Sequence, residues 1–121
     1  MENQKANTLV DKILTDLDTS GINKEGLIDD IKALRSYALE EQVPLVVKIL
    51  RYTYEHIEAN DTFLIPILGD EPLDEVEGVE VVNDMDTPVE RLKYLIALTK
   101  NLNNKGNIAD LREYKELFAK Y

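Results

Sequence analysis

The stretch PLVVKILRYTYEHIEA, residues 44–59, decides the fold class. Pro44 is well placed at the first position of a helix, where its missing N–H costs no hydrogen bond. The apolar residues that follow recur at helical spacing and cover more than one face. They are Leu45, Val46, Val47, Ile49, Leu50, Tyr52, Tyr54 and Ile57. The stretch therefore predicts the central, most buried helix of an all-α protein.

Two helices are predicted before this stretch. Thr8, with Asp11 three residues on, is expected to cap a helix over residues 8–19. Asn23 is expected to cap a second helix over residues 24–41. Both segments carry apolar residues at helical spacing, so each has one face to bury.

Two helices are predicted after it. Residues 87–90, TPVE, combine a capping box with proline at the first helical position, and they open a helix over residues 88–103. Gly106 suits the turn that follows, and Asn107 with Asp110 is expected to open the last helix. The chain thus reads as a bundle of about five helices.

A long acidic connection, residues 61–86, separates the third helix from the fourth. We expect a single helical domain over residues 8–121 that contains this connection, preceded by a flexible N-terminus, residues 1–7. FLIPIL (63–68) is expected to pack over the bundle while the acids after it face water. A short hairpin between FLIPIL and the valine-rich VEGVEVV (76–82) is the alternative.

The charge is unevenly distributed along the 121 residues, whose net charge is −10. Residues 1–60 carry −4, residues 61–86 carry 9 acids and no base, and residues 87–121 carry +3. Nucleic acids and anionic membrane surfaces are bound by Lys and Arg, so this balance argues against both as partners.

The compartment is expected to be the cytoplasm. The N-terminal sequence MENQKANTLV has no cationic start followed by an apolar core, and no apolar run of about 18 residues exists. The chain has no cysteine, which excludes disulfides, thiolate metal sites and cysteine nucleophiles but leaves the redox compartment open.

The stretch DLDTSGINKEGL, residues 16–27, begins like a calcium-binding loop. An EF-hand loop that starts at Asp16 needs a bidentate glutamate at its twelfth position, which here is Leu27. A turn between helices explains the same residues, with Gly21 ending one helix and Asn23 capping the next. The prediction is therefore a turn and no calcium.

The acidic segment, defined here as residues 70–86, is the first candidate for function. Its carboxylates have no ordered spacing that would hold a metal, but they suit a basic protein partner by complementary charge. The alternative is a solvated loop that binds nothing. The candidate partner surface consists of Asp70, Glu71, Asp74, Glu75, Glu77, Glu80, Asp84 and Asp86.

The second candidate for function is a pocket on the helix over residues 44–59. Lys48, Tyr52 and His56 share one helical face by four-residue spacing, and His56 could supply an acid or base there. No recognisable catalytic set accompanies it, and Thr53 stands where a di-iron bundle has glutamate. A half-buried histidine with no catalytic role is the simpler explanation, and no cofactor is expected.

Three functional hypotheses follow. The first is a non-enzymatic interaction or regulatory protein that binds a protein partner through its acidic surface, which would suit a basic partner. The second is a small ligand-binding or enzymatic bundle with a site near His56 and Tyr52. The third is a homo-oligomeric structural subunit, because the helix over residues 44–59 is apolar on many faces.

Overall fold

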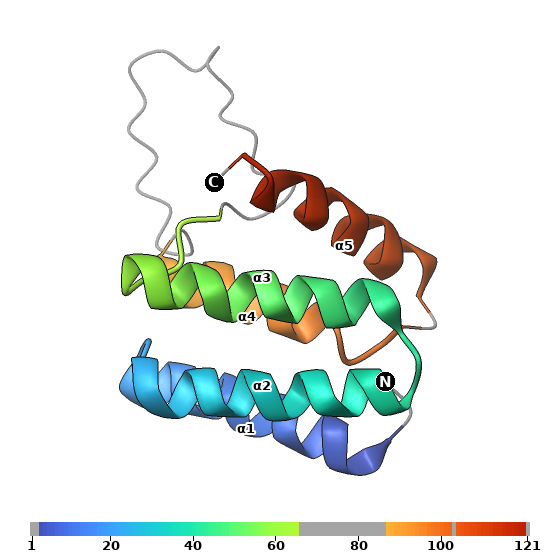
Figure 1. The fold of residues 1–121 in the computed structure, drawn as a ribbon. Coiled ribbons are helices and arrows are strands. Elements are labelled where there is room, and N and C mark those ends of the chain that lie inside the picture. Colours follow the sequence, from blue (N-terminus) through green and yellow to red (C-terminus); the bar gives the residue numbers. More distant parts are fainter. Residues whose placement is uncertain (1–2, 66–86, 103, 121) are drawn as a thin grey trace.

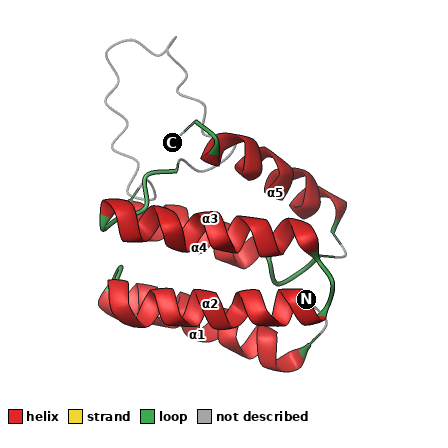
Figure 2. Ribbon diagram, in the orientation of Figure 1, coloured by secondary structure: helices red, strands yellow, loops and turns green. Residues whose placement is uncertain are grey.

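The structure is a computed structural model that describes residues 3–65, 87–102 and 104–120. These residues form helices joined by turns and contain no strand, which confirms the all-α prediction (Figure 2). None of the described helices is long and apolar enough to cross a membrane. The helices are α1 (Gln4–Ser20), α2 (Lys24–Glu40), α3 (Pro44–Asn60), α4 (Pro88–Leu98) and α5 (Lys105–Phe118).

The helices stack in three levels (Figure 1). α1 and α2 lie against each other at the base, α3 stacks on α2, and α4 stacks on α1. α5 crosses the opposite side of α3 and α4 and contacts both. The acidic connection leaves the end of α3 and returns at the start of α4, as the sequence predicts.

α3 is buried over a broad face because α2 covers one side of it and α5 the other. Its buried side chains are Val46, Ile49, Leu50, Thr53, His56 and Ile57, the longest such set of the five helices. The buried Thr53 hydroxyl donates to the Ile49 carbonyl at 2.7 Å, so its polar atom is satisfied within the helix. α3 is therefore the central helix, in agreement with the prediction.

α1 starts earlier than predicted. The side chain of Asn3 accepts a hydrogen bond from the Lys5 N–H at 2.8 Å and caps the helix, so Thr8 is not the cap. Ala6, which was predicted to lie in a flexible N-terminus (residues 1–7), is fully buried in the first turn. The expected boundary was wrong because Asn3 offers a cap one turn upstream of Thr8.

The α4–α5 connection also differs from the prediction. α4 ends at Leu98, where the Thr99 hydroxyl donates to the Ile96 carbonyl at 2.7 Å. Asn104 then caps α5 by accepting from the Gly106 N–H at 2.8 Å, so Gly106 lies in the first turn of the helix. The Thr87 cap was correct: its side chain accepts from the Glu90 N–H at 3.1 Å.

The calcium-like stretch is an inter-helix turn, as predicted. Gly21 ends α1 at φ 68°, a conformation that suits glycine. Asn23 occupies the N-cap position of α2, but its side chain makes no capping hydrogen bond. Lys12 Nζ lies 3.0 Å from Asp16 and 2.7 Å from Asp30, so one lysine ammonium bridges these two carboxylates.

The turn between α2 and α3 contains a strained residue. Gln42 is exposed and adopts φ 57°, in the left-handed region that costs a non-glycine residue about 1–2 kcal/mol. Gln42→Gly should therefore stabilise the protein by about 0.5–1 kcal/mol in urea unfolding, after the added entropy of the unfolded glycine is subtracted. Ala33→Gly, at an exposed position inside α2, should destabilise by about 1 kcal/mol. A loss of stability in both variants would contradict the turn geometry.

The beginning of FLIPIL packs into the core, as expected. Phe63 and Ile65 are fully buried, whereas Leu64 between them is 41% exposed. This alternation is typical of an extended segment with one face on the bundle. The rest of FLIPIL, VEGVEVV and the alternative hairpin lie outside the described residues.

Candidate functional site

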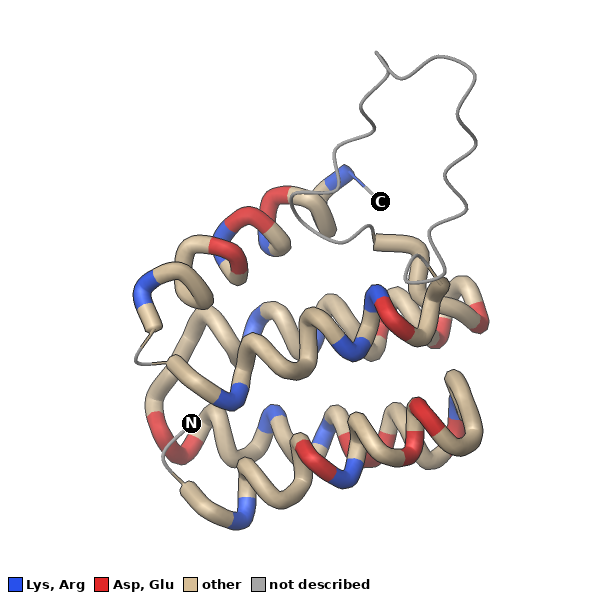
Figure 3. The backbone as a smooth tube through the Cα atoms, turned by 180° about the vertical axis from the view of Figure 1, so that it is seen from behind, with Lys and Arg blue, Asp and Glu red and all other residues tan. Residues whose placement is uncertain are grey.

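The candidate partner surface, Asp70 to Asp86, lies outside the described residues, but the structure shows how the remaining charges are used. Without residues 66–86 the chain carries 16 acids and 14 bases, or −2. Acidic and basic positions are mixed along the helices (Figure 3). The helical body is therefore close to neutral, and the sequence concentrates the excess negative charge in the acidic segment.

Several bases of the helical body already have acidic partners. Lys100 lies 2.8 Å from Asp11 of α1, and Lys24 lies 2.8 Å from Asp61. Lys93 of α4 contacts Asp18 of α1. These side chains are partly or largely exposed, so each pair contributes little to stability. Each pair nevertheless reduces the positive charge that the helices can offer to the carboxylates of the acidic segment.

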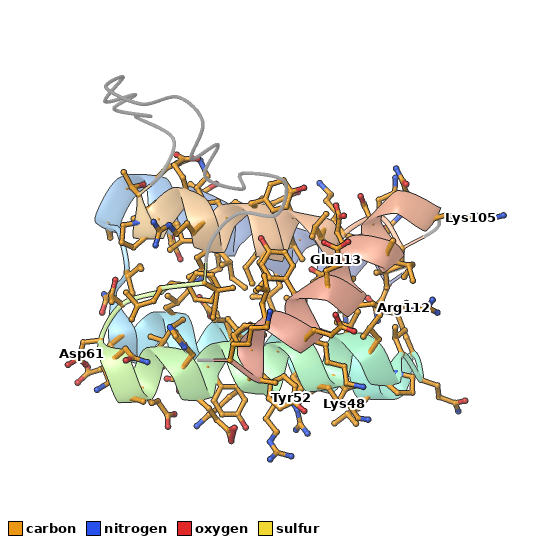
Figure 4. The ribbon with its side chains drawn as sticks, turned by 90° about the horizontal axis from the view of Figure 1, so that it is seen from above. Lys48, Tyr52, Asp61, Lys105, Arg112 and Glu113 are labelled. Atoms are coloured by element: carbon orange, nitrogen blue, oxygen red, sulfur yellow. The ribbon has the colours of Figure 1, made fainter. Side chains whose placement is uncertain are left out.

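A cavity of about 460 Å³ opens between the C-terminal halves of α3 and α5. Figure 4 shows α5 crossing α3 here, with Tyr52 on the crossed part of α3. Its walls combine aromatic rings and small residues with three charged or amide groups. The lining residues are Tyr52, Glu55, His56, Ala59, Asn60, Lys115, Phe118 and Ala119.

The rings around this cavity pack mostly edge to face. Phe118 of α5 lies 5.8 Å from Tyr52 and 6.2 Å from His56, measured between ring centroids. Phe63 packs behind them, 5.5 Å from His56 and 6.1 Å from Phe118. Such separations are typical of favourable aromatic pairs, so the cluster fixes α5 and residue 63 against α3.

His56 is 8% exposed and has a structural contact. Its Nε2 accepts a hydrogen bond from the backbone N–H of Leu64 at 3.0 Å. Burial lowers the pKa of His56, because the surroundings disfavour the charged imidazolium. The neutral ring thus ties the segment after α3 back onto the helix.

This contact predicts a pH dependence. Because the folded-state pKa of His56 is below its unfolded value of about 6.5, the unfolded chain binds the proton more readily as pH falls. The stability that His56 contributes should be complete above pH about 6.5 and decline below it. NMR titration of the single histidine should give a pKa under 6.5. The advantage of the wild type over His56→Gln should shrink between pH 7.5 and 5.5, and a pKa above 6.5 would contradict the burial argument.

Of the three predicted pocket residues, Tyr52 and His56 line the cavity and Lys48 does not. Lys48 is exposed on α3, one helical turn before Tyr52 (Figure 4). The pocket predicted from the sequence lacked the wall that α5 supplies, chiefly Lys115 and Phe118. Apolar spacing marks Phe118 as a core candidate, but nothing in the sequence indicates that α5 crosses this part of α3.

The described residues around His56 form no catalytic set of a recognisable class. Lys115 and Glu55 are the charged lining groups, and Arg51 lies 3.4 Å from the Glu55 carboxylate. Within the described ranges, no three His, Cys, Asp or Glu side chains gather closely enough to hold a metal ion. The arrangement supports binding of a small molecule better than acid–base catalysis.

Comparison of the chain with family models, with curated proteins and with solved structures finds no match.

Proposed function

We propose that the chain is a non-enzymatic interaction domain that binds a basic region of a protein partner through its acidic segment. The observation that carries the proposal is the charge distribution: residues 66–86 hold eight acids and no base, while the rest of the chain carries only −2. A concentrated field of one sign attracts a complementary surface and speeds association.

The ion pairs of the helical body support this proposal. Lys93, Lys100 and Lys24 contact acids of the described residues, which reduces the positive charge that the helices have left for the acidic segment. The three ion pairs leave α4 and the start of α2 with little positive charge for eight further carboxylates. A basic protein partner would supply the opposite charge that the segment attracts.

Pull-down from lysate tests the proposal. The wild type should retain a partner at low salt and lose much of it near physiological ionic strength, where the Debye length is about 8 Å. Changing all eight acids of the segment to Asn or Gln should abolish capture at both salt concentrations. Capture that survives this neutralisation would refute the acidic segment as the binding surface.

A matched control separates local charge from net charge. Five exposed helix acids that take part in none of the ion pairs seen in the described residues can be neutralised instead: Glu25, Asp29, Glu40, Glu113 and Glu116. We expect this variant to capture the same partner as the wild type.

We also propose that the protein is located in the cytoplasm, which cell fractionation would test.

The observation that suggested a homo-oligomer has another explanation in the structure. The hypothesis started from the breadth of the apolar surface of α3, and α2 and α5 of the same chain contact that helix. Leu39, at 52% exposure, and Leu64, at 41%, are the large apolar side chains of the described residues that stay exposed. They lie on different segments, so we propose a partner of another kind.

A further inference from the structure

The cavity between α3 and α5 has the size and walls of a small-molecule site. Its volume of about 460 Å³ lies within the range of roughly 300–1,000 Å³ that is usual for ligand pockets. Tyr52, His56 and Phe118 form an aromatic wall, and Ala59 and Ala119 leave room beside it. A flat apolar ring could pack against this wall in the edge or offset geometry that aromatic pairs prefer.

The charged groups at the rim of the cavity favour a ligand with a negative charge. The carboxylate of Glu55 already has a cation, Arg51, at 3.4 Å. Lys115, which is exposed on α5, makes no ion pair with any described residue. Among the described residues, the lining therefore offers one cation without an acidic partner next to the aromatic wall.

We propose that this cavity binds a small aromatic molecule carrying one anionic group, with the ring against Tyr52 and Phe118 and the anion at Lys115. The aromatic wall supplies most of the binding through apolar contact, and the lysine selects the charge of the ligand. Every described residue that lines the cavity belongs to α3 or α5, except Ala119, which directly follows α5.

Three matched probes test the charge preference: naphthalene-2-carboxylate, the neutral naphthalene-2-carboxamide and 2-naphthylmethylammonium. Each is titrated into the 15N-labelled full chain at physiological salt, where distant charges are largely screened. We expect the carboxylate to shift the amide signals of Tyr52, His56 and Phe118, with a dissociation constant about fivefold lower than that of the carboxamide.

Two variant pairs locate the interaction. Lys115→Met should remove the preference for the carboxylate, whereas Lys120→Met, at an exposed lysine that does not line the cavity, should keep it. Ala59→Trp, which fills the cavity from an exposed position, should abolish binding of the carboxylate. Ala33→Trp, at an exposed position on α2, should leave binding unchanged and controls for the added ring.

Four results would overturn the proposal. Equal affinity for the three probes, or tighter binding of the ammonium, would refute recognition of an anion. Signal shifts that lie outside the cavity, or carboxylate binding that persists in Ala59→Trp, would refute the location. None of these results bears on capture of a basic partner by the acidic segment, so the two proposals fail separately.

Discussion

Phe63→Ala is expected to destabilise the protein by about 3–5 kcal/mol, the usual cost of removing a fully buried phenylalanine ring. Phe63 is 0% exposed although it lies outside any helix, and its ring packs against His56 and Phe118. Its removal would leave a cavity beneath the crossing of α3 and α5. Urea unfolding followed by circular dichroism measures the loss, and Phe63→Leu, which keeps most of the volume, should lose much less.

Leu64→Ala is the matched control for this prediction. Leu64 is the next residue along the same segment and is 41% exposed, so its truncation should cost less than about 1 kcal/mol. Equal losses at the two positions would mean that the segment after α3 does not pack with alternate residues inward. The prediction that FLIPIL packs over the bundle would then be wrong for residues 63–65.

Tyr114→Ala is expected to undock α5 and to cost about 3 kcal/mol or more. α5 contributes two fully buried side chains, Leu111 and Tyr114, and the Tyr114 ring also packs 6.3 Å from that of Tyr94 on α4. Loss of the larger one removes much of what holds this helix. Hydrogen exchange should show α5 amides losing protection first, with α1 and α2 less affected.

Glu113→Ala tests whether the loss of stability in Tyr114→Ala comes from removing a buried side chain. Glu113 precedes Tyr114 and is exposed, so its change should alter stability by no more than about 0.5 kcal/mol and leave α5 protected. Because α5 forms one wall of the aromatic cavity, Tyr114→Ala should also weaken binding of naphthalene-2-carboxylate. Uniform loss of protection over all helices would show instead that α5 unfolds only with the whole protein.

Periodicity and caps predicted the helices well wherever the signal was local. The spacing of apolar residues in 44–59 gave the central helix, and Pro88 with the Thr87 cap gave the start of α4. The predicted starts of α1 and α5 were wrong because another residue supplies the cap, and the predicted end of α4 was too late. Asn3 and Asn104 lie close upstream of the caps that were predicted, Thr8 and Asn107, and geometry rather than residue type decided between them.

The cavity was only half predictable. Tyr52 and His56 share a face of one helix, so their proximity follows from helical spacing alone. Lys115 and Phe118 reach the same place from the other end of the chain, because α5 crosses α3 at that point. Such a crossing depends on the packing of all five helices, and no local pattern encodes it.

The most direct test of the proposed function compares the affinity of the captured partner for two variants of equal charge. One neutralises five acids of the acidic segment, Asp70, Glu71, Asp74, Glu75 and Glu77; the other neutralises the five helix acids of the control variant. Both have a net charge of −5 instead of −10. At physiological salt, we expect affinity to fall at least about tenfold in the first variant and less than about twofold in the second. Equal losses in the two variants would contradict the account, because binding would then follow net charge rather than the acidic segment.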